Sequence, residues 1–208
     1  MRLLVPFDAR EPNTRLDAVL SPAERHDLAE RLLADLLAAF RAAGAEPTVL
    51  ATGHVDCDAP VTVDERPLTP AINNVLADAL PAGEAVAVVM ADLALATGPV
   101  ISRFLGADGD VVIAPGLGGG TNALLVRHPD VRVDYHGVSV RDHLAAAREA
   151  GASVRVVDSF RLAIDIDEPP DLLEVLVHGE GRTSAWLRDA GFHVATPDGE
   201  PVLKRTVE

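Results

Sequence analysis

Short apolar runs alternate with longer segments of helical periodicity along most of this 208-residue chain. Such an alternation is typical of a mainly parallel sheet that helices cover on both faces. We expect strands at residues 2–6, 48–52, 61–63, 86–90, 111–113, 131–135, 154–157 and 160–166. We expect helices at residues 21–44, 70–80, 139–150 and 182–190, with others starting near residues 98 and 169. The pattern therefore predicts one α/β domain over residues 1–208, with a mobile tail from about Thr196.

A glycine-rich run at residues 114–124 carries the strongest functional signal. It follows the β-branched residues 111–113 and contains three successive glycines, 118–120, directly before Thr121 and Asn122. Successive glycines expose backbone N–H groups without an obstructing Cβ atom, and the following hydroxyl and amide add polar groups beside them. The run predicts a loop that holds a phosphate or a carboxylate, although glycine-rich loops also occur as plain turns.

Three aspartates mark the carboxyl ends of two other expected strands. Asp92 follows residues 86–90, and the run at residues 160–164 ends at Asp165-Ile166-Asp167. Open α/β sheets bind their ligands at the carboxyl ends of the strands. Two carboxylates on one side of an extended chain repel each other unless a cation or a basic group lies nearby. Each aspartate can be read instead as a solvated residue, but three of them beside a glycine loop favour a Mg²⁺ site with oxygen ligands.

The composition limits the partners of the chain. A formal net charge of −14 excludes duplex nucleic acid, because such a field repels its phosphates. Lys204 is the only lysine, and an acidic, lysine-poor surface resembles those of proteins from salt-accumulating archaea. A general acidic bias, with arginine favoured by high-GC coding, is the alternative. No run is long enough to span a membrane, and no signal-peptide pattern opens the chain, so we expect a cytoplasmic protein without a membrane partner.

Four segments, taken in order, resemble the 2-phospho-L-lactate guanylyltransferase family. They are Pro6-Phe7 with Thr14-Arg15-Leu16, then Ala91-Asp92-Leu93, then the glycine run through Leu124, and finally Asp-Ile-Asp-Glu-Pro-Pro-Asp-Leu at residues 165–172. The resemblance covers nearly the whole chain and implies the nucleotide-diphospho-sugar transferase-like fold. It also implies a reaction of coenzyme F420 biosynthesis, in which GMP from GTP is joined to 2-phospho-L-lactate and pyrophosphate is released.

The resemblance further implies roles for individual residues. The catalytic residues, which would also hold one or two Mg²⁺ ions, are Asp92, Asp165 and Asp167. The residues implied to bind the nucleotide are Pro6, Phe7, Arg15 and Asn73. Those implied to bind the acceptor are Gly120, Thr121, Asn122, Gly137 and Ser139, although simple helix capping explains Ser139 equally well. Asp8 and Asn13 stand where the family commonly has lysine, which leaves Arg10 and Arg15 to supply the positive charge.

Two other functions and the oligomeric state stay open at this point. A related transferase of the same fold would share the metal residues but move a nucleotide onto phosphoenolpyruvate, a sugar phosphate or molybdopterin. A non-catalytic nucleotide-binding module would agree with the missing lysines, but it has no need of all three carboxylates. The sequence is compatible with a homodimer without requiring one.

Overall fold

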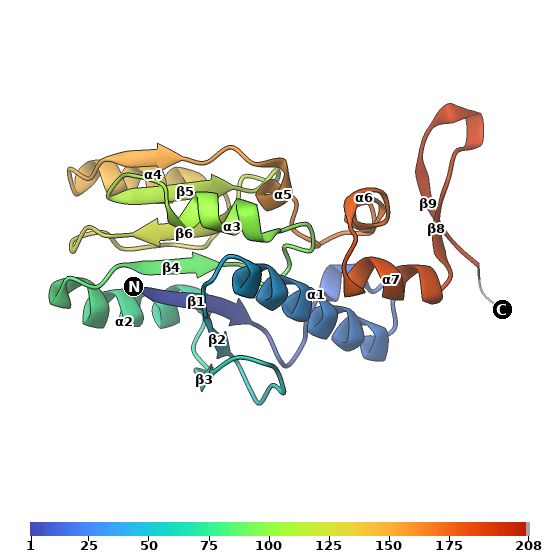
Figure 1. Cartoon of the computed structure of the whole chain (residues 1–208), viewed down its shortest axis with the longest axis horizontal. Helices are drawn as coiled ribbons and strands as arrows, with labels where there is room; N and C mark the ends of the chain where they lie inside the picture. Colours follow the sequence, from blue (N-terminus) through green and yellow to red (C-terminus); the bar gives the residue numbers. More distant parts are fainter. Residues whose placement is uncertain (207–208) are drawn as a thin grey trace.

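A seven-stranded sheet forms the centre of the computed structural model, which describes residues 1–206 (Figure 1). The strands are β1 (Arg2–Phe7), β2 (Thr48–Ala51), β3 (Val61–Val63), β4 (Val86–Val89), β5 (Val111–Pro115), β6 (Thr121–Val126) and β7 (Val154–Val156). Their order across the sheet is β3-β2-β1-β4-β6-β5-β7. β6 runs antiparallel to β4 and β5, whereas the other neighbouring pairs are parallel. The N-terminal end of β6 therefore lies at the same edge of the sheet as the carboxyl ends of its neighbours.

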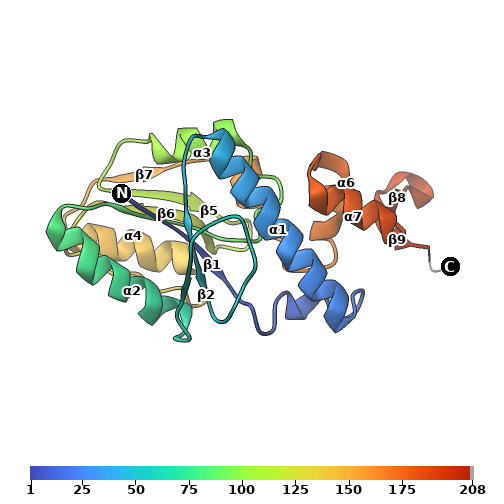
Figure 2. The ribbon, with the colours of Figure 1, turned by 60° about the horizontal axis from the view of Figure 1, so that its bottom comes forward.

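Helices cover both faces of this sheet, as Figure 2 shows. On one face lie α1 (Pro22–Ala42) and α3 (Gly98–Leu105), whose buried Phe40 and Phe104 share a core with β1 and β5. On the other face lie α2 (Leu68–Ala79) and α4 (Ser139–Glu149), which bury Ile72 and Ala147. Because both faces are covered, β4 is buried along its whole length, as its unbroken apolar sequence indicates.

The first residues of α1 determine where this helix begins. The Ser21 side chain accepts a hydrogen bond from the Glu24 backbone N–H, and the Glu24 carboxylate accepts from the Ser21 backbone N–H at 2.8 Å. Pro22 occupies the first helical position, where its missing N–H costs nothing. This capping box is the one that the sequence Ser-Pro-Ala-Glu predicts.

The C-terminal part of the chain packs against the first half of α1. Leu172 of α6 (Asp171–His178) and Leu187 of α7 (Arg182–Asp189) share a buried cluster with Leu28 and Leu32 of α1. Beyond them, β8 (Phe192–Ala195) and β9 (Val202–Arg205) form an antiparallel hairpin that projects from the body in Figure 1. Between these strands lies a short 3₁₀ turn at Pro197–Gly199.

The tail expected to be mobile from Thr196 thus contains β9, and Arg205 attaches it to the rest of the chain. The Arg205 guanidinium donates to the carbonyls of Val19 and Ala190, both at 3.0 Å, and also pairs with the Glu24 carboxylate. Mobility of this segment stays a prediction, and its last two residues, 207–208, lie outside the described residues.

We expect Glu24→Gln to destabilise the protein at neutral pH. The hydrogen bond from Arg205, followed by those from Ser21, lowers the pKa of Glu24 to about 2, so this stabilisation is present above the ordinary value of 4.5 and is lost as pH falls toward 2. Because solvent still reaches this pair, whose side chains are 29% and 28% exposed, the expected loss is about 1 kcal/mol at pH 7. Denaturant unfolding at pH 7 and pH 3 measures the difference, which should shrink at the lower pH; an equal loss at both would contradict the ion-pair explanation.

Two expected strands are wrong. Residues 131–135 are irregular because the Asn73 side chain binds Val133, accepting from its N–H at 2.9 Å and donating to its carbonyl at 2.8 Å, in the place of a neighbouring strand. Residues 160–166 form the short helix α5 (Phe160–Ala163) followed by an extended segment. Alternate residues are buried there, as the expected strand requires, but none of them joins the sheet. Leu162 lies in the helical turn, and Ile164 and Ile166 pack against residues of α6.

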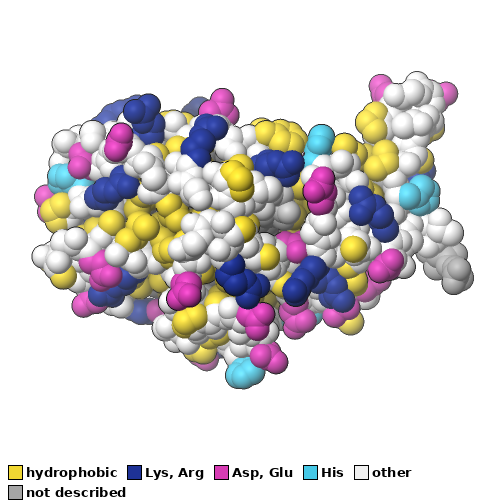
Figure 3. Space-filling model, viewed as in Figure 1, with side chains coloured by type: hydrophobic (Ala, Val, Ile, Leu, Met, Phe, Trp, Pro, Cys, Tyr) yellow, Lys and Arg dark blue, Asp and Glu magenta, His cyan; other side chains and the backbone are white. Residues whose placement is uncertain are grey.

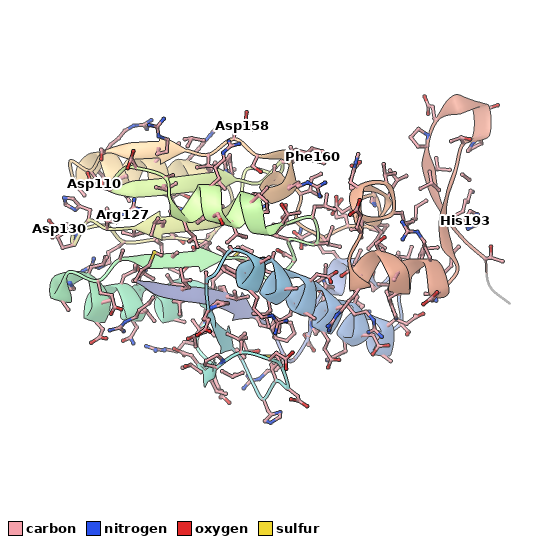
Figure 4. All side chains as sticks on the ribbon, viewed as in Figure 1. Asp110, Arg127, Asp130, Asp158, Phe160 and His193 are labelled. Atoms are coloured by element: carbon pink, nitrogen blue, oxygen red, sulfur yellow. The ribbon has the colours of Figure 1, made fainter. Side chains whose placement is uncertain are left out.

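The end of the sheet opposite α6 and α7 carries charged residues that take no part in the cleft described below. Figure 4 places Asp110, Arg127 and Asp130 there, and the Arg127 backbone N–H donates to the Asp110 carbonyl at 2.8 Å. On the face drawn in Figure 3, arginine and acidic side chains are interspersed. In the stretch from Met1 to Thr206, no helix has the length and apolar character needed to cross a membrane.

Candidate active site

A cleft of about 440 Å³ opens at the carboxyl ends of β1 and β4. The loop after β1 forms one wall, and the residues that precede α2 form another. Open α/β sheets bind ligands at this edge. The lining includes the predicted site residues Pro6, Phe7, Arg15, Asp92 and Asp167.

The three predicted catalytic carboxylates meet beside this cleft. Asp92 follows β4, and the Ile166 backbone N–H donates to the Asp92 carbonyl at 3.2 Å, which holds the segment with Asp165 and Asp167 against it. Asp165 Oδ1 accepts a hydrogen bond from the Asn122 amide at 3.1 Å. Carboxylates from two distant parts of the chain, Asp92 and the pair Asp165 and Asp167, therefore form one acidic cluster, and Asn122 from a third part binds it.

The electrostatics of this cluster favour a bound cation. Asp92 Oδ1 is buried and accepts no hydrogen bond from residues 1–206. Desolvation, and then the charges of Asp165 and Asp167, raise the pKa of Asp92 to about 7. Burial also raises the pKa of Asp167, against the opposing effect of Arg15. An unpartnered buried carboxylate oxygen next to two more carboxylates fits a hard divalent cation, although in the described part of the chain no three acidic, histidine or cysteine side chains already form a ligand set.

The loop after β1 brings positive charge to the cleft. Arg15 lies in a short 3₁₀ turn, Thr14–Leu16, and its guanidinium pairs with the Asp167 carboxylate at 2.9 Å. Asn13 adopts a left-handed conformation at φ 51°, and its side-chain amide donates to the Ile166 carbonyl at 3.0 Å. The first loop and the Asp165–Asp167 segment are thus held together by two side chains.

Sequence reasoning missed two charged residues that line the same cleft, Asp64 and Arg66. The Arg66 guanidinium donates to both carboxylate oxygens of Asp64, with Nε at 2.8 Å from Oδ1. This contact lowers the pKa of Asp64, whose carboxylate is mostly buried. A charged Asp-x-Arg-Pro stretch before a helix was the available signal, and it is a weak one.

The glycine run forms the tight connection between β5 and β6. The Gly116 N–H donates to the Gly120 carbonyl at 2.9 Å, and the Gly119 N–H donates to Gly116 at 3.1 Å. Gly119 has φ +84°, and a Cβ atom there would lie 2.9 Å from Val138. A Cβ atom at Gly116 would lie 2.6 Å from the Asn122 side chain. Close packing therefore explains two of these glycines without a ligand.

The predicted acceptor residues form a second group next to the carboxylates. Thr121 and Ser139 are buried, and Ser139 Oγ donates to Thr121 Oγ1 at 3.3 Å. Gly137 is exposed in the turn before α4, with φ +54°. The Gly120 carbonyl accepts from the Gly116 N–H and so closes the connection at residues 116–120, which we call the glycine hairpin. Asn122 joins this group to the acidic cluster through Asp165, but none of the five residues lines the cleft itself.

Asn73 lies apart from both groups. Its side-chain amide is engaged with the backbone of Val133, and it does not line the cleft. By contrast, His143, which sequence reasoning did not single out, lies at the centre of the acceptor group, 2.8 Å from Thr121 Oγ1. No local sequence signal marks it, because a lone histidine in a helix is common on any face.

A comparison with family models and curated proteins gives matches along the whole chain. A model described as guanylyl transferase CofC like matches residues 1–208. The chain is 56% identical over 205 residues to the 2-phospho-L-lactate guanylyltransferase of Halomicrobium mukohataei. This match covers 99% of this chain and 100% of that protein. It is 57% identical to the protein of the same name from Natronomonas pharaonis, over 99% of both chains.

Solved structures share the fold. A structure from Desulfovibrio desulfuricans G20, assigned to the nucleotide-diphospho-sugar transferases, has a TM-score of 0.70 at 17% identity and covers 91% of this chain and 95% of its own. A nucleotidyl transferase from Methanothermobacter has a TM-score of 0.57 at 17% identity, over 85% of this chain and 97% of its own. At such identities the likeness shows the fold alone, and it confirms the predicted fold class.

Proposed function

The chain belongs to the CofC-like guanylyl transferase family, and on that premise we propose that it joins GMP from GTP to 2-phospho-L-lactate. The products are lactyl-2-diphospho-5′-guanosine and pyrophosphate, in coenzyme F420 biosynthesis. The observation that carries the proposal is the meeting of Asp92, Asp165 and Asp167 beside a cleft that also contains Arg15. Carboxylates for a divalent cation, with an arginine for phosphate, are the groups that nucleotidyl transfer needs.

We place the nucleotide in the cleft, where Arg15 would contact the triphosphate. A guanidinium offers bidentate hydrogen bonds to phosphate oxygens, and Arg15 can exchange its Asp167 partner for them because its side chain is 64% exposed. The acceptor phosphate would lie at the glycine hairpin near Thr121. Asn122 supports this arrangement, since its amide links the hairpin to Asp165.

Asp92, Asp165 and Asp167 would hold one or two Mg²⁺ ions. When bound, Mg²⁺ offsets the negative charge of the nucleotide phosphates, which lowers the repulsion between donor and acceptor. A phosphate oxygen of 2-phospholactate attacks the α-phosphorus of GTP in line. The new oxygen–phosphorus bond forms as the bond to the β-phosphate bridging oxygen breaks, and pyrophosphate leaves. No general base is needed, because the second pKa of a phosphate monoester is about 6.

A substrate panel tests the proposal. Purified enzyme with MgCl₂ is mixed with GTP, ATP or CTP and with 2-phospholactate, phosphoenolpyruvate or 3-phosphoglycerate, and pyrophosphate release and product mass are recorded. We expect GTP with 2-phospholactate to give the highest kcat/KM. A higher value with phosphoenolpyruvate would assign the alternative acceptor, and no turnover with any pair would favour a non-catalytic nucleotide-binding module.

The acidic, lysine-poor composition leads to an expected salt dependence. We infer a halophilic adaptation, which agrees with the net charge of −14 and with the haloarchaeal sources of the relatives. The melting temperature should rise from 0.1 M to about 2 M KCl, because the screening length falls to roughly 3 Å near 1 M salt and self-repulsion weakens. Sucrose of equal osmolality, which is excluded from the surface but screens no charge, is the control. A flat or falling melting temperature in KCl would point to neutral compositional drift.

A further inference from the structure

Three buried polar side chains, Thr121, Ser139 and His143, form what we call the Thr121 cluster. They are 4%, 3% and 1% exposed, respectively. Ser139 and His143 are four residues apart on α4, so both side chains project from the same face of that helix. Both of them contact Thr121 Oγ1, His143 through Nδ1 at 2.8 Å and Ser139 through Oγ at 3.3 Å.

The hydrogen bonds of His143 determine which ring nitrogen carries the proton. The Asp134 backbone N–H donates to His143 Nε2 at 3.2 Å. A backbone amide can only donate, so Nε2 presents its lone pair and the hydrogen of the neutral ring is on Nδ1. The Tyr135 ring packs edge-on against the imidazole, with the two ring centroids 4.8 Å apart. Burial lowers the pKa of His143 to about 4, so the imidazole is neutral at pH 7. His143 Nδ1–H therefore donates to Thr121.

This arrangement decides what the Thr121 hydroxyl can do. A hydroxyl oxygen has two lone pairs, and at Thr121 they accept from His143 and from Ser139. The hydroxyl hydrogen must then point elsewhere. Between Met1 and Thr206, it has no acceptor among the hydrogen bonds of the protein. In this arrangement the Thr121 hydroxyl is left to act as a donor to an incoming group.

An irregularity in β6 directs the cluster toward the carboxylates. Ala114 pairs with Ala123 but Pro115 pairs with Thr121, so Asn122 is an extra residue in β6. Such a bulge changes the direction of the side chains that precede it. As a result, Thr121 turns toward α4 while the adjacent Asn122 reaches Asp165 at 3.1 Å. The Thr121 cluster and the acidic cluster are attached to consecutive residues of one strand.

We propose that His143 is a positioning residue for the acceptor phosphate: as the neutral Nδ1–H tautomer it holds Thr121 so that the threonine hydroxyl donates to a phosphate oxygen of the acceptor. The inference rests on the proposed function, in which that phosphate binds at the glycine hairpin. His143 itself touches neither substrate. It acts through Thr121, and nothing in its role involves the nucleotide.

Two conservative variants separate the two hydrogen bonds of the ring. The amide nitrogen of His143→Asn can occupy the position of Nδ1 and donate to Thr121, whereas the longer side chain of His143→Gln reaches the position of Nε2 and keeps the bond from Asp134. His143→Phe removes both bonds at similar volume. His26→Gln, on the exposed part of α1, is the matched control. KM for 2-phospholactate and for GTP, kcat and the melting temperature are measured for each.

We expect His143→Gln and His143→Phe to raise the KM for 2-phospholactate about 5- to 10-fold, with the KM for GTP changed less than about twofold. His143→Asn should keep most of the wild-type affinity for 2-phospholactate, even if its melting temperature falls as far as that of His143→Gln. Equal increases in both KM values, or a larger acceptor defect in His143→Asn than in His143→Gln, would overturn the inference.

The ¹⁵N NMR spectrum of the wild-type imidazole gives an independent readout that needs no substrate. It should show a protonated Nδ1 and an unprotonated Nε2 at pH 7, and the opposite tautomer or a charged ring would also overturn the inference. If the wild-type enzyme forms no product with 2-phospholactate, the proposed function fails, while the spectrum still decides the tautomer on which the role of His143 depends.

Discussion

Asp92→Asn and Asp165→Asn should each lower kcat for guanylyl transfer by about 10³-fold or more, with the fold retained. An amide keeps the shape of the carboxylate but removes the charge that would offset a divalent cation and the triphosphate. Asp167→Asn should follow the same trend less severely, as expected for a carboxylate that contacts the cation through a water molecule. Steady-state pyrophosphate release at saturating Mg²⁺, with circular dichroism of each variant, measures the effect. Activity near that of the wild type in the Asp92 or Asp165 variant would defeat the metal assignment.

The stability of Asp92→Asn provides a second readout for the same residue. The pKa of Asp92 is raised to about 7 in the folded protein, so the protonated form stabilises the fold at low pH and this stabilisation is lost as pH rises from about 4 through 7. Without Mg²⁺, Asp92→Asn should therefore melt at a higher temperature than the wild type at pH 8 and at a similar temperature at pH 4. A variant that is less stable at pH 8 would indicate that the buried carboxylate is already compensated by the protein.

Thr121→Val should raise the KM for 2-phospholactate about 10- to 100-fold while leaving the KM for GTP nearly unchanged. The substitution keeps the volume but removes the hydroxyl, and a hydrogen bond to a charged group contributes about 1.5–3 kcal/mol. Arg15→Ala should show the opposite bias, because Arg15 lines the cleft assigned to the triphosphate. Initial rates with one substrate varied and the other saturating measure both constants.

Thr121→Val and Arg15→Ala are controls for each other, because each should affect a different substrate. Thr121→Ser keeps a hydroxyl at the same position and should stay within a few-fold of the wild type. If Thr121→Val impaired GTP and the acceptor equally, or GTP alone, the glycine hairpin would have to be reassigned to the nucleotide. The placement of the two substrates would then be reversed.

The fold class and the position of Asp92 could be predicted from the sequence because their signals are local. Asp165 and Asp167 lie near Asp92 for another reason, since the strand expected at residues 160–166 does not form and an extended segment outside the sheet carries them. Periodicity and the capping box at Ser21 and Glu24 place α1 within one residue of its observed start. A carboxylate just after a buried apolar run, as at Asp92, must lie at the carboxyl edge of a sheet with parallel strands. The resemblance was borne out by the family match over residues 1–208. The Mg²⁺ ions and the roles of individual residues stay predictions.

The tertiary structure decided how the glycine run works and which groups surround it. Gly116–Gly120 connect two antiparallel strands, so two of these glycines are required for packing against Val138 and Asn122. Asn73 binds an irregular segment where a strand was expected. The bulge at Asn122 sends Thr121 toward His143, 22 residues later in the chain. Periodicity and turn chemistry act over a few residues, whereas strand pairing and side-chain direction at a bulge depend on contacts between distant segments, and no short pattern encodes those contacts.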